Sequence, residues 1–221
     1  MSRNNKRGDE MIAVGRTPCA PTKIMNRTSK ITRNTTETQI ELSLDLDGSG
    51  VFDIQLPALA GLPFWKHMLE QWSKHGGFDL TIRATGDVEI DGHHLVEDLG
   101  IALGLALNEA VGDKRGIARY GFFIAPMDEV LMLSATDFCG RAYLQLDWNL
   151  TQEKIGEFDV ALAREFFVAL ANNAKINLHI KELTGGNAHH VIEATMKATA
   201  KAMRAALTVS GDALPSTKGV L

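Results

Sequence analysis

The pattern His-His-x-x-Glu occurs twice in the chain, as HHLVE at residues 93–97 and as HHVIE at residues 189–193. A run rich in Leu, Ala, Thr and Gly, without proline, follows each copy for about four helical turns, so each copy is predicted to begin a helix. On a helix, His at position i and Glu at i+4 share one face, while the second His points about 100° away. Each copy can therefore offer one ligand to each of two metal ions.

The repeat makes the pattern specific. Four of the seven histidines fall in these two pairs, and the copies begin 96 residues apart. The alternative is that the histidines cap helices or lie in the core, but this does not explain a carboxylate at the same spacing in both copies. The sequence predicts a duplicated fold that carries metal ligands.

The order of predicted elements also repeats. In the first half, alternating apolar residues predict a β-hairpin from 38–46 and 51–56, followed by a helix, a strand and the first histidine helix (64–75, 80–84 and 93 to about 112). The second half is predicted to contain three strands, a helix, a strand and the second histidine helix (120–125, 130–137, 141–148, 160–172, 176–181 and from 189). We expect an α+β fold of two halves, 35–118 and 119–210, related by a pseudo-twofold axis. Each half would be a sheet backed by two helices, and the Ala- and Gly-rich helices could pack closely within or between subunits.

Composition excludes several classes of protein. The chain has 221 residues, of which 45% are hydrophobic and 23% charged, as in ordinary soluble domains. Residues 1–34 carry a net charge of +6, which leaves −10 for the rest of a chain whose formal charge is −4. The acidic body gives no reason to expect nucleic acid. Only Cys19 and Cys139 are present, which favours a reducing compartment, and no apolar run is long enough to span a membrane.

Residues 1–34 are basic and lack periodicity, so we expect a disordered extension. Such a composition also permits an organelle transit peptide, although Asp9 and Glu10 count against it. We therefore expect a cytoplasmic protein, with an organellar location as the alternative.

Further metal ligands can be nominated by counting back from each motif. Counting 26 residues back from His93 reaches His67, and counting 24 back from His189 reaches Glu165, on the matching helix of the second half. His179, inside an apolar strand, competes with Glu165 and has the alternative of a core or supporting histidine. Nitrogen and oxygen ligands without thiolates favour Mn²⁺, or otherwise Fe²⁺, Co²⁺ or Zn²⁺.

The sequence resembles the imidazoleglycerol-phosphate dehydratase family from about residue 33 to the C-terminus. The segments that carry the resemblance are ETQI at 37–40, HML at 67–69, GDVEIDGHH at 86–94, VED at 96–98, GIARYG at 116–121, PMDE at 126–129, GR at 140–141, EFF at 165–167, LHI at 178–180, GNAHH at 186–190 and PSTKG at 215–219.

This resemblance implies a fold of the ribosomal protein S5 domain 2-like type and a lyase of histidine biosynthesis. The enzyme would hold two Mn²⁺ ions per site and convert imidazole glycerol phosphate to imidazole acetol phosphate and water through a metal-bound imidazolate. The resemblance also implies a 24-subunit shell in which the metals bridge neighbouring chains. Neither nucleic acid nor membrane would be a partner.

The resemblance assigns roles to individual residues. Glu37 would contact substrate and act as an acid or base, and Glu97 and Glu193 would bind metal and share proton transfer. The metal ligands would be His67, His93, His94, Glu97, Glu165, His189, His190 and Glu193. His67, His93, His94 and Glu97 would also border the substrate, together with Gln71 and His75. Phosphate would be held by Arg119, Arg141, Lys197, Ser216 and Lys218, the last two in a C-terminal tail at 211–221.

Three departures from the family pattern lie near the first half-site. Lys66 precedes His67 where Asp is usual, Leu95 replaces Thr, and residues 57–63 form a longer loop. Two alternatives therefore remain: a divergent paralogue that acts on another phosphorylated azole, or a non-catalytic, metal-binding shell protein.

Overall fold

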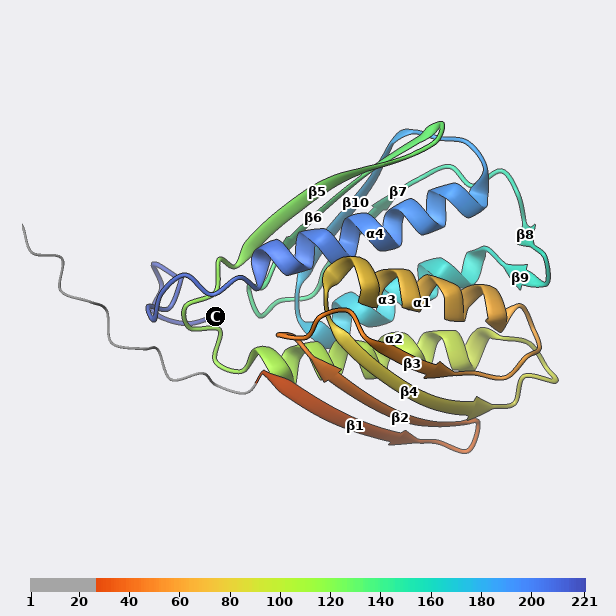
Figure 1. Cartoon of the computed structure of the whole chain (residues 1–221), viewed down its shortest axis with the longest axis horizontal. Coiled ribbons are helices and arrows are strands. Elements are labelled where there is room, and N and C mark those ends of the chain that lie inside the picture. The colour runs from red at the N-terminus through yellow and green to blue at the C-terminus, as the bar shows by residue number, and fades with distance from the viewer. Residues whose placement is uncertain (1–26) are drawn as a thin grey trace, which may run out of the picture.

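The computed structural model describes residues 27–221, and the first half of this region is an open sheet with two helices on one side (Figure 1). The strands are β1 (Thr28–Asn34), β2 (Thr38–Asp45), β3 (Phe52–Gln55) and β4 (Asp79–Gly86), in the order β1-β2-β4-β3. The helices are α1 (Leu62–Gly76) and α2 (His93–Val111). β4 runs antiparallel to β2 and parallel to β3.

The second half repeats this topology. Its sheet has the order β5-β6-β10-β7, built from β5 (Tyr120–Met127), β6 (Val130–Asp137), β7 (Tyr143–Asp147) and β10 (Asn177–Thr184). Its helices are α3 (Ala161–Ala174) and α4 (Ala188–Ala206), and β8 (Lys154–Ile155) pairs with β9 (Phe158–Asp159) before α3. Strand order, strand direction and helix positions agree between the halves, so the predicted duplicated α+β fold is confirmed.

The four long helices lie between the two sheets (Figure 1). α2 covers the first sheet and α4 the second, while α1 packs against α4 and α3 packs against α2. Each half therefore sends one helix to the histidine helix of the other half. Glycines of α2 permit its close contact with α3: a Cβ on Gly100 would lie 2.6 Å from the Phe166 carbonyl oxygen, and one on Gly104 would lie 2.7 Å from that of Leu170. The small residues thus serve a contact within the chain.

The core lies between the sheets and consists of the apolar side chains that the alternating pattern predicted. Trp65 of α1 stacks on Phe158 with ring centroids 5.3 Å apart, and its edge meets Phe166 of α3 at 4.9 Å. These buried rings join the two halves. Replacing one such ring by alanine typically lowers the free energy of unfolding by about 3–5 kcal/mol, so the contact stabilises the packing of the halves. Within residues 27–221, no helix combines the length and hydropathy needed to cross a membrane.

The predicted β-hairpin of residues 38–46 and 51–56 is wrong. β4 lies between β2 and β3 and pairs with both. Asp79 Oδ1 accepts the backbone N–H groups of Ser49 and Val51, each at 2.8 Å, so β4 holds the turn that follows β2. Alternation identified both strands, but neighbours in sequence are neighbours in a sheet only as a tendency.

A second correction concerns residues 28–34, which were assigned to the disordered extension but form β1. Ile31 is their one large apolar residue, so no hydrophobic pattern marked them. Backbone hydrogen bonds to β2 hold this strand along its length. Two side chains add polar contacts: Ser29 Oγ donates to the Ala106 carbonyl at 2.9 Å, and Arg33 pairs with Asp98 at 2.7 Å. The expectation for residues 1–26 falls outside the described part of the chain.

Arg204 of α4 ties the two halves together. Its guanidinium donates to the carbonyls of Gly76 and Gly77 at the end of α1 and, at 2.7 Å, to that of Leu46. It also lies over the Phe78 ring, 4.5 Å from its centroid. The last carbonyls of a helix lack intrahelical partners, so Arg204 supplies the donors that α1 needs.

We expect Arg204→Ala to lower the free energy of unfolding by about 2–4 kcal/mol, because hydrogen bonds to charged groups contribute roughly 1.5–3 kcal/mol each and the freed carbonyls stay partly buried. Urea denaturation followed by circular dichroism measures the change. Lys201→Ala, at an exposed position of the same helix, is the control and should change stability little. Equal losses for the two variants would contradict this role of Arg204.

Candidate metal site

Both histidine motifs begin their helices with the same local contact. Asp91 Oδ1 accepts the backbone N–H of His93 at 2.7 Å, and Asn187 Oδ1 accepts that of His189 at 2.9 Å. These contacts satisfy donors that a helix start leaves unpaired, so the sequence before each motif sets where the histidines stand.

Three predicted ligands meet between α1 and α4. His189 Nε2 lies 3.1 Å from Glu193 Oε2, and His67 Nε2 lies 3.6 Å from the same oxygen. Their ligand atoms all lie within 4.8 Å of one another, which is compatible with bonds of about 2.0–2.2 Å to one divalent ion. His67 belongs to the first half and the other two to the second, so the crossed packing of α1 on α4 assembles the group.

The Glu193 carboxylate is buried and its two oxygens have separate neighbours. Oε2 faces the histidines, while Oε1 accepts a hydrogen bond from Lys197 Nζ at 2.7 Å. Burial alone would raise the pKa of Glu193, but the Lys197 ammonium and the His189 contact outweigh it and lower that pKa. The carboxylate is therefore ionised at neutral pH, as a metal ligand must be. Lys197, predicted to bind phosphate, is engaged with Glu193.

The first motif is more open. His93 Nε2 lies 3.7 Å from Glu97 Oε2, the same i, i+4 pairing as in the second motif. Glu37 Oε2 lies 3.9 Å from His94 Nδ1, which is beyond hydrogen-bond distance. Within residues 27–221, no third side chain closes on His93 and Glu97 as His67 closes on the second pair.

The two competing ligand candidates occupy different places. Glu165 is half-buried on α3, the helix that packs against α2, but it joins neither close group of acidic and histidine side chains found in the described region. His179 is exposed on the outer face of the second sheet, where its ring lies 5.6 Å from that of Tyr143. That face points away from α4, since the neighbouring Leu178 and Ile180 are buried beneath the helix.

The second histidine of each motif is held through Nδ1 by a carboxylate. His94 Nδ1 donates to Asp87 Oδ2, and His190 Nδ1 donates to Glu129 Oε2, each at 2.9 Å. Because a carboxylate can only accept, Nδ1 carries the hydrogen, and Nε2 of the neutral ring is left as a metal ligand. Sequence reasoning did not assign Asp87 or Glu129. The position of Asp87, seven residues before His94, was a usable signal, whereas Glu129 lies 61 residues from His190 and only the fold brings the two together.

These contacts also explain a second group of side chains, Asp128, Glu129 and His190, whose ligand atoms lie close enough for a metal. Glu129 accepts hydrogen bonds from the Asn187 backbone N–H at 2.8 Å and from His190. These hydrogen bonds stabilise the ionised carboxylate and lower the pKa of Glu129 to about 2. The corresponding hydrogen bond to Asp87 raises the pKa of His94. We interpret Glu129 as orienting His190, because both donors already occupy its oxygens.

Gln71 and His75 continue the face of α1 that carries His67. His75 Nε2 lies 3.2 Å from Gln71 Oε1, and burial followed by the ammonium groups of Lys197 and Lys201 lowers the pKa of His75. His75 is thus a neutral hydrogen-bonding side chain at pH 7.

The residues predicted to bind phosphate lie at the opposite end of α4 from the histidines, apart from Lys197. Arg119 pairs with Asp137 at 2.7 Å and donates to the Pro215 carbonyl at 2.9 Å, beside Ser216 and Lys218. The Arg119 backbone N–H binds the carbonyl of Ala206, the last residue of α4. His189 lies 17 residues earlier, about 26 Å along the helix axis, so one chain does not bring these groups together (Figure 1). Arg141 is exposed, near the same end.

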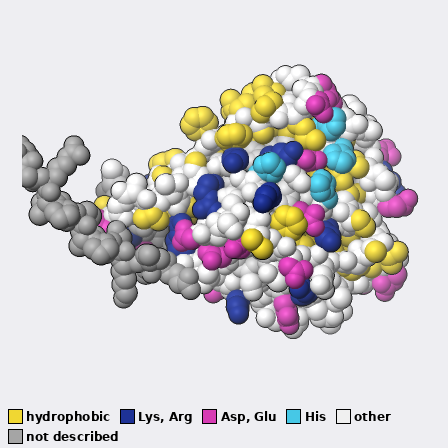
Figure 2. Space-filling view, viewed as in Figure 1, with side chains coloured by type: hydrophobic (Ala, Val, Ile, Leu, Met, Phe, Trp, Pro, Cys, Tyr) yellow, Lys and Arg dark blue, Asp and Glu magenta, His cyan; other side chains and the backbone are white. Residues whose placement is uncertain are grey.

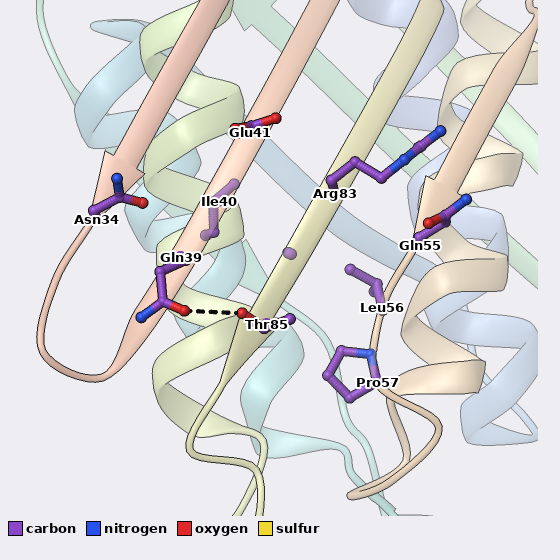
Figure 3. Close-up of a pocket in the computed structure, with 10 residues that line it drawn as sticks. Asn34, Gln39, Ile40, Glu41, Gln55, Leu56, Pro57, Arg83 and Thr85 are labelled. Carbon is purple, nitrogen blue, oxygen red and sulfur yellow. Dashed lines mark hydrogen bonds between the residues drawn. The ribbon is translucent and has the colours of Figure 1, made fainter.

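A cavity on the first sheet contains none of the nominated ligands (Figure 3). It has a volume of about 610 Å³ and is lined by polar side chains such as Gln39, Arg83 and Thr85. Thr85 Oγ1 donates to Gln39 Oε1 at 3.1 Å, and Arg83 pairs with Asp53. These side chains point to the outer face of the sheet, away from the helices.

Comparisons with known proteins agree with the sequence motifs. Residues 60–203 match the family described as Imidazoleglycerol-phosphate dehydratase. Proteins of that name from Dinoroseobacter shibae and Microcystis aeruginosa are 52% and 48% identical over 198 residues, which cover 88% of this chain and 100% and 93% of theirs.

Solved structures give the same result for the fold. The dehydratase of Staphylococcus aureus is 38% identical with a TM-score of 0.74, over 83% of this chain and 99% of that one. The Pyrococcus furiosus structure is 37% identical with a TM-score of 0.73, over 86% and 100%. The predicted resemblance is confirmed: the chain belongs to the imidazoleglycerol-phosphate dehydratase family and is an enzyme of the hydro-lyase class.

Proposed function

We propose that the chain removes water from imidazole glycerol phosphate to form imidazole acetol phosphate, a step of histidine biosynthesis, and that it does so with two Mn²⁺ ions per site. One observation carries the proposal: two copies of a His-His-x-x-Glu helix start, one of them completed by His67 from the other half of the fold. Two metal positions suit a five-membered ring with two nitrogens.

The side chains fit divalent metal. His67, His189 and Glu193 present two imidazole nitrogens and an ionised carboxylate oxygen at one point, and His93 with Glu97 presents the matching pair. His94 and His190 add Nε2 atoms, and Glu165 stays a proposed ligand of the first motif. The absence of thiolates favours Mn²⁺ over Zn²⁺. When bound, the metals would act as Lewis acids on the ring nitrogens and favour loss of the ring proton.

The carboxylates supply proton transfer. Dehydration requires a proton to leave carbon and another to reach the departing hydroxyl. Glu37 is exposed and its carboxylate stands 3.9 Å from His94 Nδ1, beyond hydrogen-bond distance, so it is available to substrate. Glu97 and Glu193 are chiefly ligands, and Lys197 keeps Glu193 ionised. Gln71 and His75 would hold the glycerol portion through hydrogen bonds.

The separation of functional residues along α4 supports a site shared between chains. A small substrate cannot span about 26 Å. The substrate bound at the histidines of one copy would therefore have its phosphate held by residues of another copy, namely Arg119, Arg141, Ser216 and Lys218. The outer face of the second sheet supports assembly as well. Tyr120, Phe122, Ile124 and Tyr143 are 59%, 72%, 42% and 51% exposed there, and Figure 2 shows hydrophobic side chains gathered over β5. We propose a homo-oligomer, the 24-subunit shell of the resemblance, with metals at subunit interfaces.

The local departures leave the ligands accessible. Lys66 Nζ lies 3.7 Å from Glu70 Oε1, and Glu70 Oε2 lies 3.9 Å from His67 Nδ1. The ammonium therefore faces Glu70 rather than the His67 ring, and Glu70 supplies a carboxylate on the Nδ1 side. This favours the dehydratase over a divergent paralogue or a non-catalytic shell protein.

Turnover tests the function directly. Metal-stripped protein should be inactive with imidazole glycerol phosphate and should form the ketone product when Mn²⁺ is restored, with two metals bound per chain at saturation. Mg²⁺ should restore little activity, because it binds imidazole poorly. Metal binding without turnover would favour the paralogue or the shell protein.

His67→Ala tests the crossed ligand group. Removing one of three converging ligands should lower Mn²⁺ affinity by about 10–100-fold or more and reduce kcat, because effects of this size already follow loss of an outer-shell partner. His179→Ala is the matched control, since His179 lies on the far side of the second sheet, and it should bind Mn²⁺ like the wild type. Metal titration gives the Mn²⁺ affinity of each variant. A larger loss of affinity in His179→Ala than in His67→Ala would make His179 the ligand.

Mixed oligomers test sharing between chains. His190→Ala should abolish turnover and loosen assembly, because metal binding and association are linked, and Lys218→Ala should raise KM. Chains carrying the two substitutions separately should regain activity on coexpression, since some sites combine an intact motif with an intact tail. Coexpression of two tail variants is the control. Activity no greater than the sum of the two pure variants would place both groups of residues in one chain's site.

A further inference from the structure

The two halves can be aligned strand by strand, and the alignment pairs Glu37 with Glu129. β2 and β6 are both eight residues long, and their last residues, Asp45 and Asp137, face the first residues of β4 and β10. Glu37 comes directly before β2, and Glu129 directly before β6. Both carboxylates thus stand in the turn that precedes the second strand of their half, near the second histidine of a motif.

In the second half, the turn carboxylate reaches the histidine because glycine makes room for it. Glu129 Oε2 accepts the His190 Nδ1–H at 2.9 Å. A Cβ on Gly186 would lie 2.3 Å from Glu129 Oε1 and 2.4 Å from its Cγ, so the Glu129 side chain occupies the space that a side chain at position 186 would need.

In the first half, an acidic side chain occupies the corresponding place. Asp87 directly follows β4. When β4 is aligned with β10 by their registers, Asp87 is equivalent to Gly185, or to Gly186 once the irregularity between Glu182 and Thr184 is allowed for. Asp87 Oδ2 accepts the His94 Nδ1–H at 2.9 Å, and Glu37 Oε2 stands 3.9 Å from the same nitrogen.

We propose that Asp87 is a positioning residue that has taken over from Glu37 the task of holding His94, and that it thereby leaves Glu37 free to act on the substrate. Glu129, the counterpart of Glu37, remains committed to His190. Of the two equivalent glutamates, only Glu37 would thus be free. The part of the inference that concerns substrate rests on the proposed function; the part that concerns His94 does not.

Removal of the Asp87 side chain should return the first half to the arrangement of the second. Asp87 makes no other side-chain hydrogen bond in the described region, and its backbone contacts to Glu37 and Ile90 do not need the carboxylate. With glycine at position 87, Glu37 has a short distance to move to accept the His94 Nδ1–H. Metal binding would survive, but the carboxylate needed for proton transfer would be engaged.

A double-mutant cycle on the full-length, metal-stripped protein tests this. Mn²⁺ is titrated into the wild type, Asp87→Gly, Glu37→Ala and the double variant, and the free ion is followed by its electron paramagnetic resonance signal. Alanine is used at position 37 because a glutamine amide oxygen could still accept the His94 Nδ1–H. Each single variant should bind Mn²⁺ within a few-fold of the wild type, because one carboxylate remains to orient His94. The double variant should lose about 10–100-fold in affinity for the ion held by His94, the usual effect of deleting an outer-shell partner.

Turnover gives the second readout. Both single variants should lose kcat, Glu37→Ala because the proton-transfer group is lost and Asp87→Gly because Glu37 is captured by His94, with KM little changed. Glu89→Ala removes an exposed acid two residues further along the same loop. It is the matched control and should behave like the wild type in both assays. Thermal unfolding of each variant separates loss of orientation from loss of fold.

The outcomes separate this inference from the proposed function. If Asp87→Gly alone loses Mn²⁺ as fully as the double variant, Glu37 does not replace Asp87, and the inference fails. Wild-type affinity in the double variant would also overturn it, since neither carboxylate would then hold His94. If the wild type does not dehydrate the substrate but the Mn²⁺ cycle is as expected, the proposed function fails while the assignment of Asp87 stands.

Gly186→Ala provides an independent check in the other half. Gly186 does not have a positive φ, so alanine fits its backbone, but its Cβ should displace Glu129 from His190. The alanine at position 186 cannot take the place of Glu129, since it has no carboxylate to hold His190. Mn²⁺ affinity should therefore fall by about as much as in Glu129→Ala, on the order of 10–100-fold. Unchanged affinity in Gly186→Ala alone would remove the steric part of the argument.

Discussion

The buried carboxylate of Glu193 constrains how the two halves pack. An ionised group inside a protein is destabilising unless it is paired. Removing one partner of a buried ion pair typically lowers the free energy of unfolding by about 3–5 kcal/mol. Lys197 pairs with one oxygen, and the histidines 67 and 189 face the other. Since His67 belongs to α1, this arrangement requires α1 to cross from the first half and lie against α4. The aromatic contacts of Trp65 and the Arg204 hydrogen bonds hold α1 in that position.

Duplication produced two halves with one topology, but the halves now differ in use. The first sheet presents polar side chains such as Gln39 and Arg83 outward, whereas the second presents tyrosines and phenylalanines. The first histidine motif is open and stands beside an uncommitted glutamate, whereas the second is closed by His67 and by Glu129. A shared topology therefore does not imply identical roles, because a single side chain at a strand end changes which carboxylate reaches a histidine.

The long axis of α4 separates two kinds of chemistry. Its beginning carries imidazoles and a carboxylate, which bind metal, and its end adjoins guanidinium and ammonium groups, which bind anions. Under the proposed function, a single chain would contain the parts of a site without its assembled form. The exposed aromatic face of the second sheet provides a surface on which copies could associate, and association would join the beginning of one α4 to the end of another.

The sequence by itself determined the duplication, the approximate positions of most helices and strands, and the identity of the family, because periodicity and repeated motifs are local properties of the chain. It also nominated His67, which lies 26 residues before the first motif, much as Glu165 lies 24 residues before the second. Only the tertiary structure decided which elements became neighbours. It inserted β4 between β2 and β3, recruited the polar strand β1 through backbone hydrogen bonds, and crossed α1 over to α4, so that His67 serves the motif of the other half. It also showed that Asp87 and Glu129 hold the histidines. Apart from that of Asp87 with His94, such contacts join residues far apart in sequence, and their energies depend on packing and distance that no local pattern encodes.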